Sequence, residues 1–171
     1  QYRIAGQSCM DAFQGSHNPP AVHHGSGHRS NWPCRCYTIS IPPISFFAYG
    51  SLRYGVNVAG ATLDASAASR ILTGAGPGPT FAATVRAWRY DGVRVSAIAK
   101  INYNPFSTFH GVNVAGGDVD ADGFAEIASA PGPGPSNPTS FVGHDYDGDP
   151  VQSLPGFLVT PWTNTLYGAR V

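Results

Sequence analysis

Apolar residues alternate with small or polar residues in short runs through the last third of this chain. The runs fall at about 111–116, 125–130, 139–145 and 151–159, and turn-forming residues separate them. Alternation over runs of this length predicts half-buried β-strands. The stretch PGPGPSN excludes a helix before the third run because it is rich in proline and glycine, and Asp147-Gly148 predicts a hairpin turn before the fourth. The pattern therefore predicts four antiparallel strands.

The same pattern occurs twice at one spacing. YGVNVAGATLDASAASRILTGAGPGPT begins at residue 54 and HGVNVAGGDVDADGFAEIASAPGPGPS begins at residue 110, an offset of 56 residues. The agreement continues at this offset for about fifty residues. YRIAG at 2–6 and YTISIPPISFFAY at 37–49 resemble the opening and the close of an earlier copy, and the chain ends on another opening, YGARV. The chain is therefore built from an internal repeat.

Four antiparallel strands in a repeat of this length are typical of a β-propeller blade. We predict an all-β fold of propeller-type blades of four antiparallel strands, about three blades plus one extra strand. The whole chain, 1–171, forms one repeat domain, with approximate blades at 1–53, 54–109 and 110–166 and with 167–171 starting a further strand. Three open blades would leave strand edges unpaired, so we expect an oligomer or a part of a larger chain or assembly.

Composition agrees with this predicted fold, and the distribution of charge limits the classes of ligand to be expected. The chain has 21 Gly and 15 Pro but only 12% charged residues, which fits short strands and turns. It has no apolar window long enough to span a membrane, and since it opens with Gln1 and shows no signal peptide we expect a processed chain or a fragment. The residues after 110 carry a formal charge of −6, whereas the basic residues before them are scattered singly. This distribution favours a divalent cation over nucleic acid as a ligand.

The strongest candidate site is the acidic stretch GGDVDADGFAEI at 116–127. Four carboxylates, those of Asp118, Asp120, Asp122 and Glu126, surround the turn at Gly123. Like charges at this spacing repel each other unless a cation lies between them, and Ca²⁺ takes six to eight oxygen ligands from such loops. The loop is shorter than the twelve-residue helix–loop–helix motif. The alternative is a solvated acidic turn without a metal.

These residues, with the GVNVAG and PGPGP stretches on either side, resemble the FG-GAP/VCBS repeats of integrin-alpha-like β-propellers. The match is good over 110–150, fair over 37–109 and poor over 7–36. The resemblance implies that the loop between the first two strands of a blade binds Ca²⁺. It also implies a ligand set, namely the side chains of Asp118, Asp120, Asp122 and Glu126 and the backbone carbonyl of Phe124.

The matching loop of the preceding repeat, ATLDASAASRI, has lost this set of carboxylates. Thr62, Ser66 and Arg70 replace the first and third aspartates and the final glutamate, and only Asp64 remains. One carboxylate beside a cation does not make a useful calcium site. We therefore predict that this loop closes without a metal, through an ion pair between Asp64 and Arg70.

Residues 7–36 interrupt the repeat and are either a genuine loop-rich insert or a stretch read out of frame. They contain cysteines and histidines that could bind zinc, with a polar surface loop as the alternative. An odd number of cysteines leaves one unpaired within the chain, and a bond from Cys9 to one of the other two would suit an oxidising compartment. The residues concerned are Cys9, Cys34, Cys36, His17, His23, His24 and His28.

The resemblance and the lack of a G-x-S-x-G motif favour a non-enzymatic role. We expect a calcium-stabilised module for protein interaction or structural assembly in a secreted or cell-surface complex, with the periplasm as the other location. The expected partner is a protein or further propeller blades, and not nucleic acid. One alternative is a lectin-like propeller that binds glycans, and another is an accessory domain of a secreted enzyme. Aromatic residues at the blade ends are expected to pack between blades or to stack on sugars: Phe46, Phe47, Tyr49, Tyr103, Phe106, Trp162 and Tyr167.

Overall fold

The structure is a computed structural model that describes residues 44–50, 53–66, 68–146 and 150–171. The chain separates into two compact units, Gln1–Ile44 and Ser45–Val171, and nearly all of the first lies outside the described residues. The predictions for residues 1–43 of the first blade, which include the segment 7–36 with its cysteines and histidines, therefore concern residues outside the described ranges. The second unit is described over most of its length.

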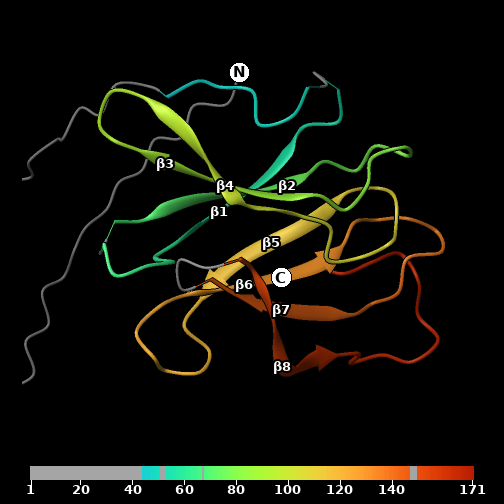
Figure 1. The fold of residues 1–171 in the computed structure, drawn as a ribbon. Coiled ribbons are helices and arrows are strands. Elements are labelled where there is room, and N and C mark those ends of the chain that lie inside the picture. Colours follow the sequence, from blue (N-terminus) through green and yellow to red (C-terminus); the bar gives the residue numbers. More distant parts are fainter. Residues whose placement is uncertain (1–43, 51–52, 67, 147–149) are drawn as a thin grey trace, which may run out of the picture. The chain divides into compact units, whose positions relative to one another are not determined.

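This second unit is all-β, as predicted, and its described residues contain no helix (Figure 1). Two four-stranded antiparallel sheets follow one another along the chain, each with its strands in sequence order. The first sheet contains β1 (Val56–Ala61), β2 (Arg70–Ala75), β3 (Val85–Tyr90) and β4 (Val95–Tyr103). The second contains β5 (Val112–Gly117), β6 (Glu126–Pro131), β7 (Phe141–Asp145) and β8 (Gln152–Val159).

The sequence repeat is a structural repeat. The first three strands of the second sheet each begin 56 residues after their counterparts in the first. The pairing registers agree as well, since Val56 faces Ala75 in one sheet and Val112 faces Pro131 in the other. Even the irregularity between the third and fourth strands recurs at the same offset. The four strands predicted for the last unit are thus confirmed, with bounds that shift by no more than two residues.

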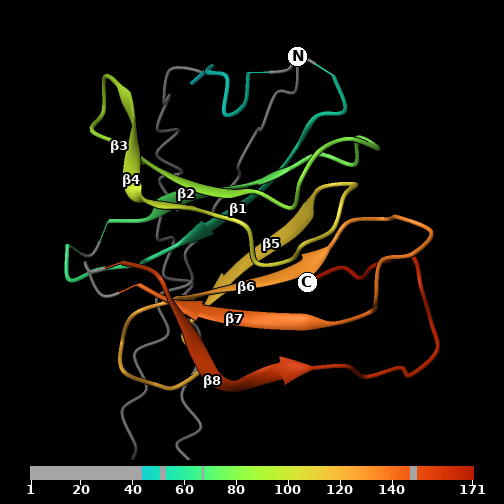
Figure 2. The same cartoon turned by 45° about the vertical axis from the view of Figure 1, so that its right-hand side comes forward.

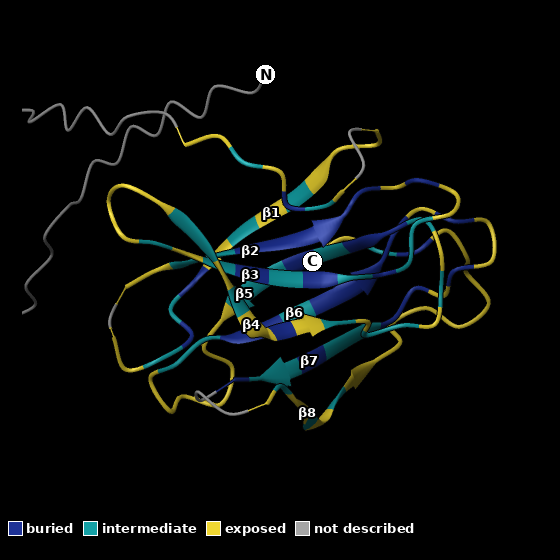
Figure 3. Cartoon of the chain, turned by 45° about the horizontal axis from the view of Figure 1, so that its top comes forward, coloured by how far each residue is buried: buried dark blue, intermediate teal, exposed yellow. Residues whose placement is uncertain are grey.

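The second sheet meets the first through its first strand, β5. β1 and β2 both contact β5, as Figure 2 shows. Large apolar side chains from both sheets fill this contact and are almost completely buried, and they include Leu63, Leu72, Val85, Ile101, Val112 and Ile127. The second strands, β2 and β6, are the most buried strands, and Figure 3 shows both in the buried colour over most of their length. One core is therefore shared by the two sheets.

Backbone contact at this interface requires residues without side chains. A Cβ on Gly74 of β2 would overlap the carbonyl oxygen of Val112, and a Cβ on Gly116 of β5 would overlap the Cβ of Ala61. Each glycine therefore lets the neighbouring strand approach to van der Waals contact.

The propeller arrangement itself stays a prediction, because the described residues contain two sheets and no closed ring of blades. Residues 167–171 form no strand. They are instead held by hydrogen bonds to the second repeat, from Gly168 N–H to Asn137, from Ala169 N–H to Pro131, and from the side chain of Asn113 to the carbonyl oxygen of Ala169.

We predict that Val112→Ala destabilises the protein by about 2 kcal/mol, since it removes two buried methyl groups from the interface between the sheets. Val93→Ala is the control, because Val93 is 91% exposed and its truncation should change the free energy of unfolding by less than about 0.5 kcal/mol. Urea unfolding of both variants measures the difference. Equal effects of the two substitutions would show that the sheets do not share a core.

Candidate metal centre

The acidic loop connects β5 to β6. Asp118 follows the last residue of β5, and Glu126 is the first residue of β6. Between them the backbone turns through two left-handed conformations, at Ala121 (φ 63°) and at Gly123 (φ 96°). These turns reverse the chain within a few residues and direct the loop back toward its own start.

Three of the four predicted carboxylates come together. Asp118, Asp120 and Glu126 each place one carboxylate oxygen so that the three oxygens lie within 4.8 Å of one another. Oxygens bound to a single Ca²⁺ at 2.3–2.6 Å can be up to about 5 Å apart, so one ion could contact all three. Asp118 and Asp120 are exposed, whereas Glu126 is only 1% exposed.

Backbone N–H groups of the loop hold the carboxylates in place. Val119 N–H donates to Glu126 Oε2 at 2.6 Å, and Gly123 N–H donates to Asp118 Oδ2 at 3.1 Å. Asp120 Oδ1 accepts a longer bond from Asp122 N–H at 3.3 Å. The loop therefore positions its ligands by its own hydrogen bonds.

The carboxylate of Asp122 lies outside this cluster, and the backbone carbonyl of Phe124, the fifth predicted ligand, belongs to the same loop. Asp122 Oδ1 accepts a hydrogen bond from Phe124 N–H at 2.8 Å, which turns this carboxylate toward the backbone. The side chain of Phe124 lines a shallow groove beside the loop.

Glu126 is the residue whose environment points to a cation. Its Oε1 is buried and has no hydrogen-bond partner among the residues that the structure describes. Burial raises the pKa of Glu126, the charges of Asp120 and Asp122 raise it further, and the hydrogen bond from Val119 opposes them. A buried carboxylate oxygen without a partner costs free energy, the more so next to two further carboxylates. A bound cation would remove both costs, so the residues present fit a metal.

The corresponding loop of the first sheet contains the predicted ion pair. Arg70 Nη2 lies 2.8 Å from Asp64 Oδ2 and 2.9 Å from Oδ1, and Nε lies 3.3 Å from Oδ2. Ser66 donates to Asp64 and accepts from Arg70. These hydrogen bonds, first that of Ser66 and then that of Arg70, lower the pKa of Asp64. A guanidinium thus supplies positive charge in the loop equivalent to the acidic one.

The two loops are in contact with each other, which was not predicted from the sequence. Ala125 N–H donates to the carbonyl oxygen of Thr62 at 2.7 Å. The groove beside the acidic loop lies between the two sheets and is lined by Gly60, Ala61, Thr62 and Ser69 of the first and by Gly116, Asp118, Gly123, Phe124 and Ala125 of the second. The signal that could have revealed it is the glycine in GVNVAG, which occurs in both copies, at 60 and at 116.

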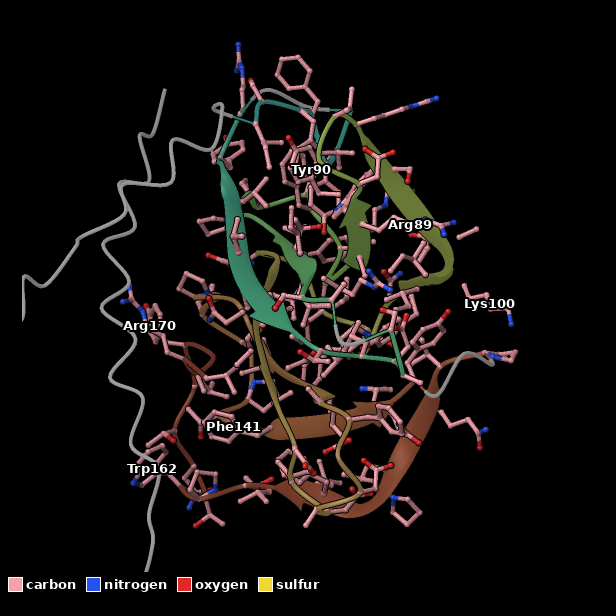
Figure 4. The ribbon with its side chains drawn as sticks, turned by 90° about the vertical axis from the view of Figure 1, so that its left-hand side faces the viewer. Arg89, Tyr90, Lys100, Phe141, Trp162 and Arg170 are labelled. Atoms are coloured by element: carbon pink, nitrogen blue, oxygen red, sulfur yellow. The ribbon has the colours of Figure 1, made fainter. Side chains whose placement is uncertain are left out.

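The aromatic residues divide into two groups. Phe46 packs against Trp88 at a tilt with ring centroids 5.0 Å apart, Tyr103 packs against His144 at 4.6 Å, and the hydroxyl of Tyr49 lies within hydrogen-bond distance of the carbonyl oxygens of Thr73 and Thr84. Phe106 packs against the core. Phe47, Trp162 and Tyr167 are instead more than half exposed, and Figure 4 shows Trp162 projecting from the ribbon. Packing therefore accounts for four of the seven aromatic residues singled out in the sequence.

Comparison of the chain with family models, with curated proteins and with solved structures finds no match. The likeness to FG-GAP/VCBS repeats accordingly stays a prediction. Within the part of the chain that the structure describes, no helix has the length and apolarity needed to cross a membrane.

We predict that Glu126→Gln has opposite effects with and without calcium. With a chelator at neutral pH the variant should be more stable than the wild type, because it removes a buried charge that faces two others. With calcium it should be less stable, since the ion loses a charged ligand. Urea unfolding of both proteins in the two solutions measures the sign of each difference.

The pH dependence in chelator provides a second measurement. Since the folded-state pKa of Glu126 is raised, its contribution to stability is fully present below the ordinary value near 4.5 and is lost as the pH rises through the folded pKa. The difference in the free energy of unfolding between the wild type and Glu126→Gln, measured at each pH, separates the contribution of Glu126 from those of the other carboxylates. Parallel stability curves for the two proteins would contradict the placement of Glu126.

Proposed function

We propose that this chain is a non-enzymatic, calcium-stabilised β-repeat module that mediates protein interaction or structural assembly in a secreted or cell-surface complex. The observation that carries the proposal is the buried carboxylate of Glu126, which has an oxygen without a hydrogen-bond partner in the described part of the chain and lies in one cluster with Asp118 and Asp120. Like-charged groups at this distance are stable together when a cation neutralises them.

The donor set favours Ca²⁺ among the common metals. All the donors are oxygens, whereas Zn²⁺ in proteins is bound mainly by nitrogen and sulfur. Mg²⁺ demands near-ideal octahedral geometry and keeps several of its waters, while Ca²⁺ accepts irregular sets of six to eight oxygens from flexible loops. Asp118, Asp120 and Glu126 would hold the ion, and Asp122 and the carbonyl of Phe124 are close enough in sequence to complete its shell.

The ion in this proposal is a structural element. Bound between Asp118 and Glu126, it would connect the end of β5 to the start of β6. The hydrogen bond from Ala125 to Thr62 extends that connection to the first sheet. Calcium sites of modest affinity are filled at extracellular calcium concentrations, which supports a secreted or surface location.

Glycan binding is the second candidate, and the exposure of Trp162 and Tyr167 supports it. These side chains are 59% and 67% exposed, and aromatic rings in this state can stack on sugar rings. The two lie five residues apart in the chain, next to the second sheet. A glycan array without a binding signal would leave protein interaction as the proposed role.

We predict that calcium raises the thermal midpoint of the wild type and that Asp120→Asn abolishes this increase. At a free calcium concentration of about 100 times Kd, the ion would stabilise the folded state by about 2.7 kcal/mol. Asp64→Asn is the matched control, because Asp64 occupies the same position of the repeat but pairs with Arg70. Its stability should fall, yet its response to calcium should equal that of the wild type.

Thermal melts of the three proteins with calcium and with chelator measure the shifts. A wild-type midpoint that is the same in both solutions would refute the calcium site.

A further inference from the structure

The last residues of the chain lie on the second sheet in the way that residues 110–112 lie on the first. Gly111 N–H donates to the carbonyl oxygen of Phe81 at 3.1 Å. Gly168 N–H donates to the carbonyl oxygen of Asn137 at 3.0 Å, and Asn137 is the repeat counterpart of Phe81. The opening of the second repeat and the C-terminal segment therefore occupy equivalent positions.

The asparagine of GVNVAG makes the same contact in both places. Asn57 Nδ2 donates to the carbonyl oxygen of Val112 at 2.7 Å. Its counterpart, Asn113, donates through Nδ2 to the carbonyl oxygen of Ala169. Each amide thus binds the residue that comes after the glycine of the next opening segment. Ala169 N–H also donates to Pro131 at 3.1 Å, so this residue is bound through both of its backbone polar groups.

Both positions require glycine for two reasons. Gly111 and Gly168 have φ angles of 72° and 70°, which lie in the left-handed region. A Cβ on Gly111 would overlap the carbonyl oxygens of Ala75 and Gly76, and a Cβ on Gly168 would overlap those of Pro131 and Gly132. Gly168 is buried, although Tyr167, the residue before it, is exposed.

We propose that Asn113, Pro131, Gly132 and Asn137 form a peptide-binding site where β5 begins and β6 ends, selective for a segment whose central glycine has a left-handed conformation. We call it the strand-capture site. Its occupant is the segment 167–169 of this chain, which binds as the opening of a further repeat unit. The partner class is accordingly another four-stranded unit of the same repeat. The inference depends on the repeat geometry and does not require the calcium site.

The surface of the second sheet agrees with this role. Val119 is 50% exposed, whereas Leu63, its counterpart in the first sheet, is completely buried. Phe141 and Phe157 are half-buried, while their counterparts Val85 and Ile101 are buried. In the first sheet these positions belong to the core shared with the second sheet. A further unit that begins at the strand-capture site would cover the corresponding positions of the second.

The first test uses Gly168→Ala in the full chain, with calcium present throughout. We expect release of the segment, seen as a loss of hydrogen-exchange protection of at least about tenfold at residues 168 and 169, because the left-handed strain and the steric overlap add. Gly50→Ala is the control, since none of the described residues comes within 4 Å of a Cβ at Gly50 and its φ is ordinary. Unchanged protection in Gly168→Ala would overturn the proposal.

The second test adds labelled peptide TLYGARV, the sequence of residues 165–171, to the Gly168→Ala protein. It should bind at least about tenfold more tightly than the same peptide with alanine in place of glycine, and Asn113→Ala in the protein should weaken it. Equal binding of the two peptides, or no binding of either, would overturn the proposal. The calcium-dependent shift of the thermal midpoint should be the same in every variant. Its presence or absence tests the calcium site independently of the peptide-binding result.

Discussion

The close approach of β1 and β2 to β5 is the contact on which the rest of the structure depends. A single four-stranded sheet exposes two faces, and burial of one of them requires a second sheet at van der Waals distance. Gly74 and Gly116 permit that distance because a side chain at either position would collide with the opposite strand. This close approach buries the valines and leucines of the core. It also brings the two connecting loops into contact.

The two loops occupy the same place in the repeat but differ in charge. In the first loop the positive charge belongs to the chain itself, because the guanidinium of Arg70 pairs with the carboxylate of Asp64. In the second, glutamate replaces the arginine, and the loop gathers carboxylates instead of pairing them. A fixed cation needs no ligand from solution but contributes little when it is partly exposed. The proposed calcium ion would add more stability, and it makes that stability depend on the solution.

Much of this architecture could be predicted from local sequence. Strand positions follow from alternation and turn residues, and the repeat offset places counterparts correctly in both sheets. The pair of Asp64 and Arg70 was predictable because both residues belong to one short loop. The burial of Glu126 was not predictable, because it depends on how β6 packs in the second sheet. The hydrogen bond between the carboxylate of Asp122 and the backbone was not predictable either. Contacts such as that of Asn113 with Ala169 join residues 56 positions apart and required the fold.

The hydrogen bond from Ala125 to Thr62 has a thermodynamic consequence. It joins the loop that would hold the ion to the neighbouring sheet, so in the proposed calcium-bound form separation of the sheets and release of the ion would be linked equilibria. Linkage is reciprocal: if calcium strengthens the interface, a force or partner that opens the interface weakens calcium binding by the same factor. In an assembly of such units under tension, the calcium affinity of the loop that contains Asp118, Asp120 and Glu126 would report the load on its interface.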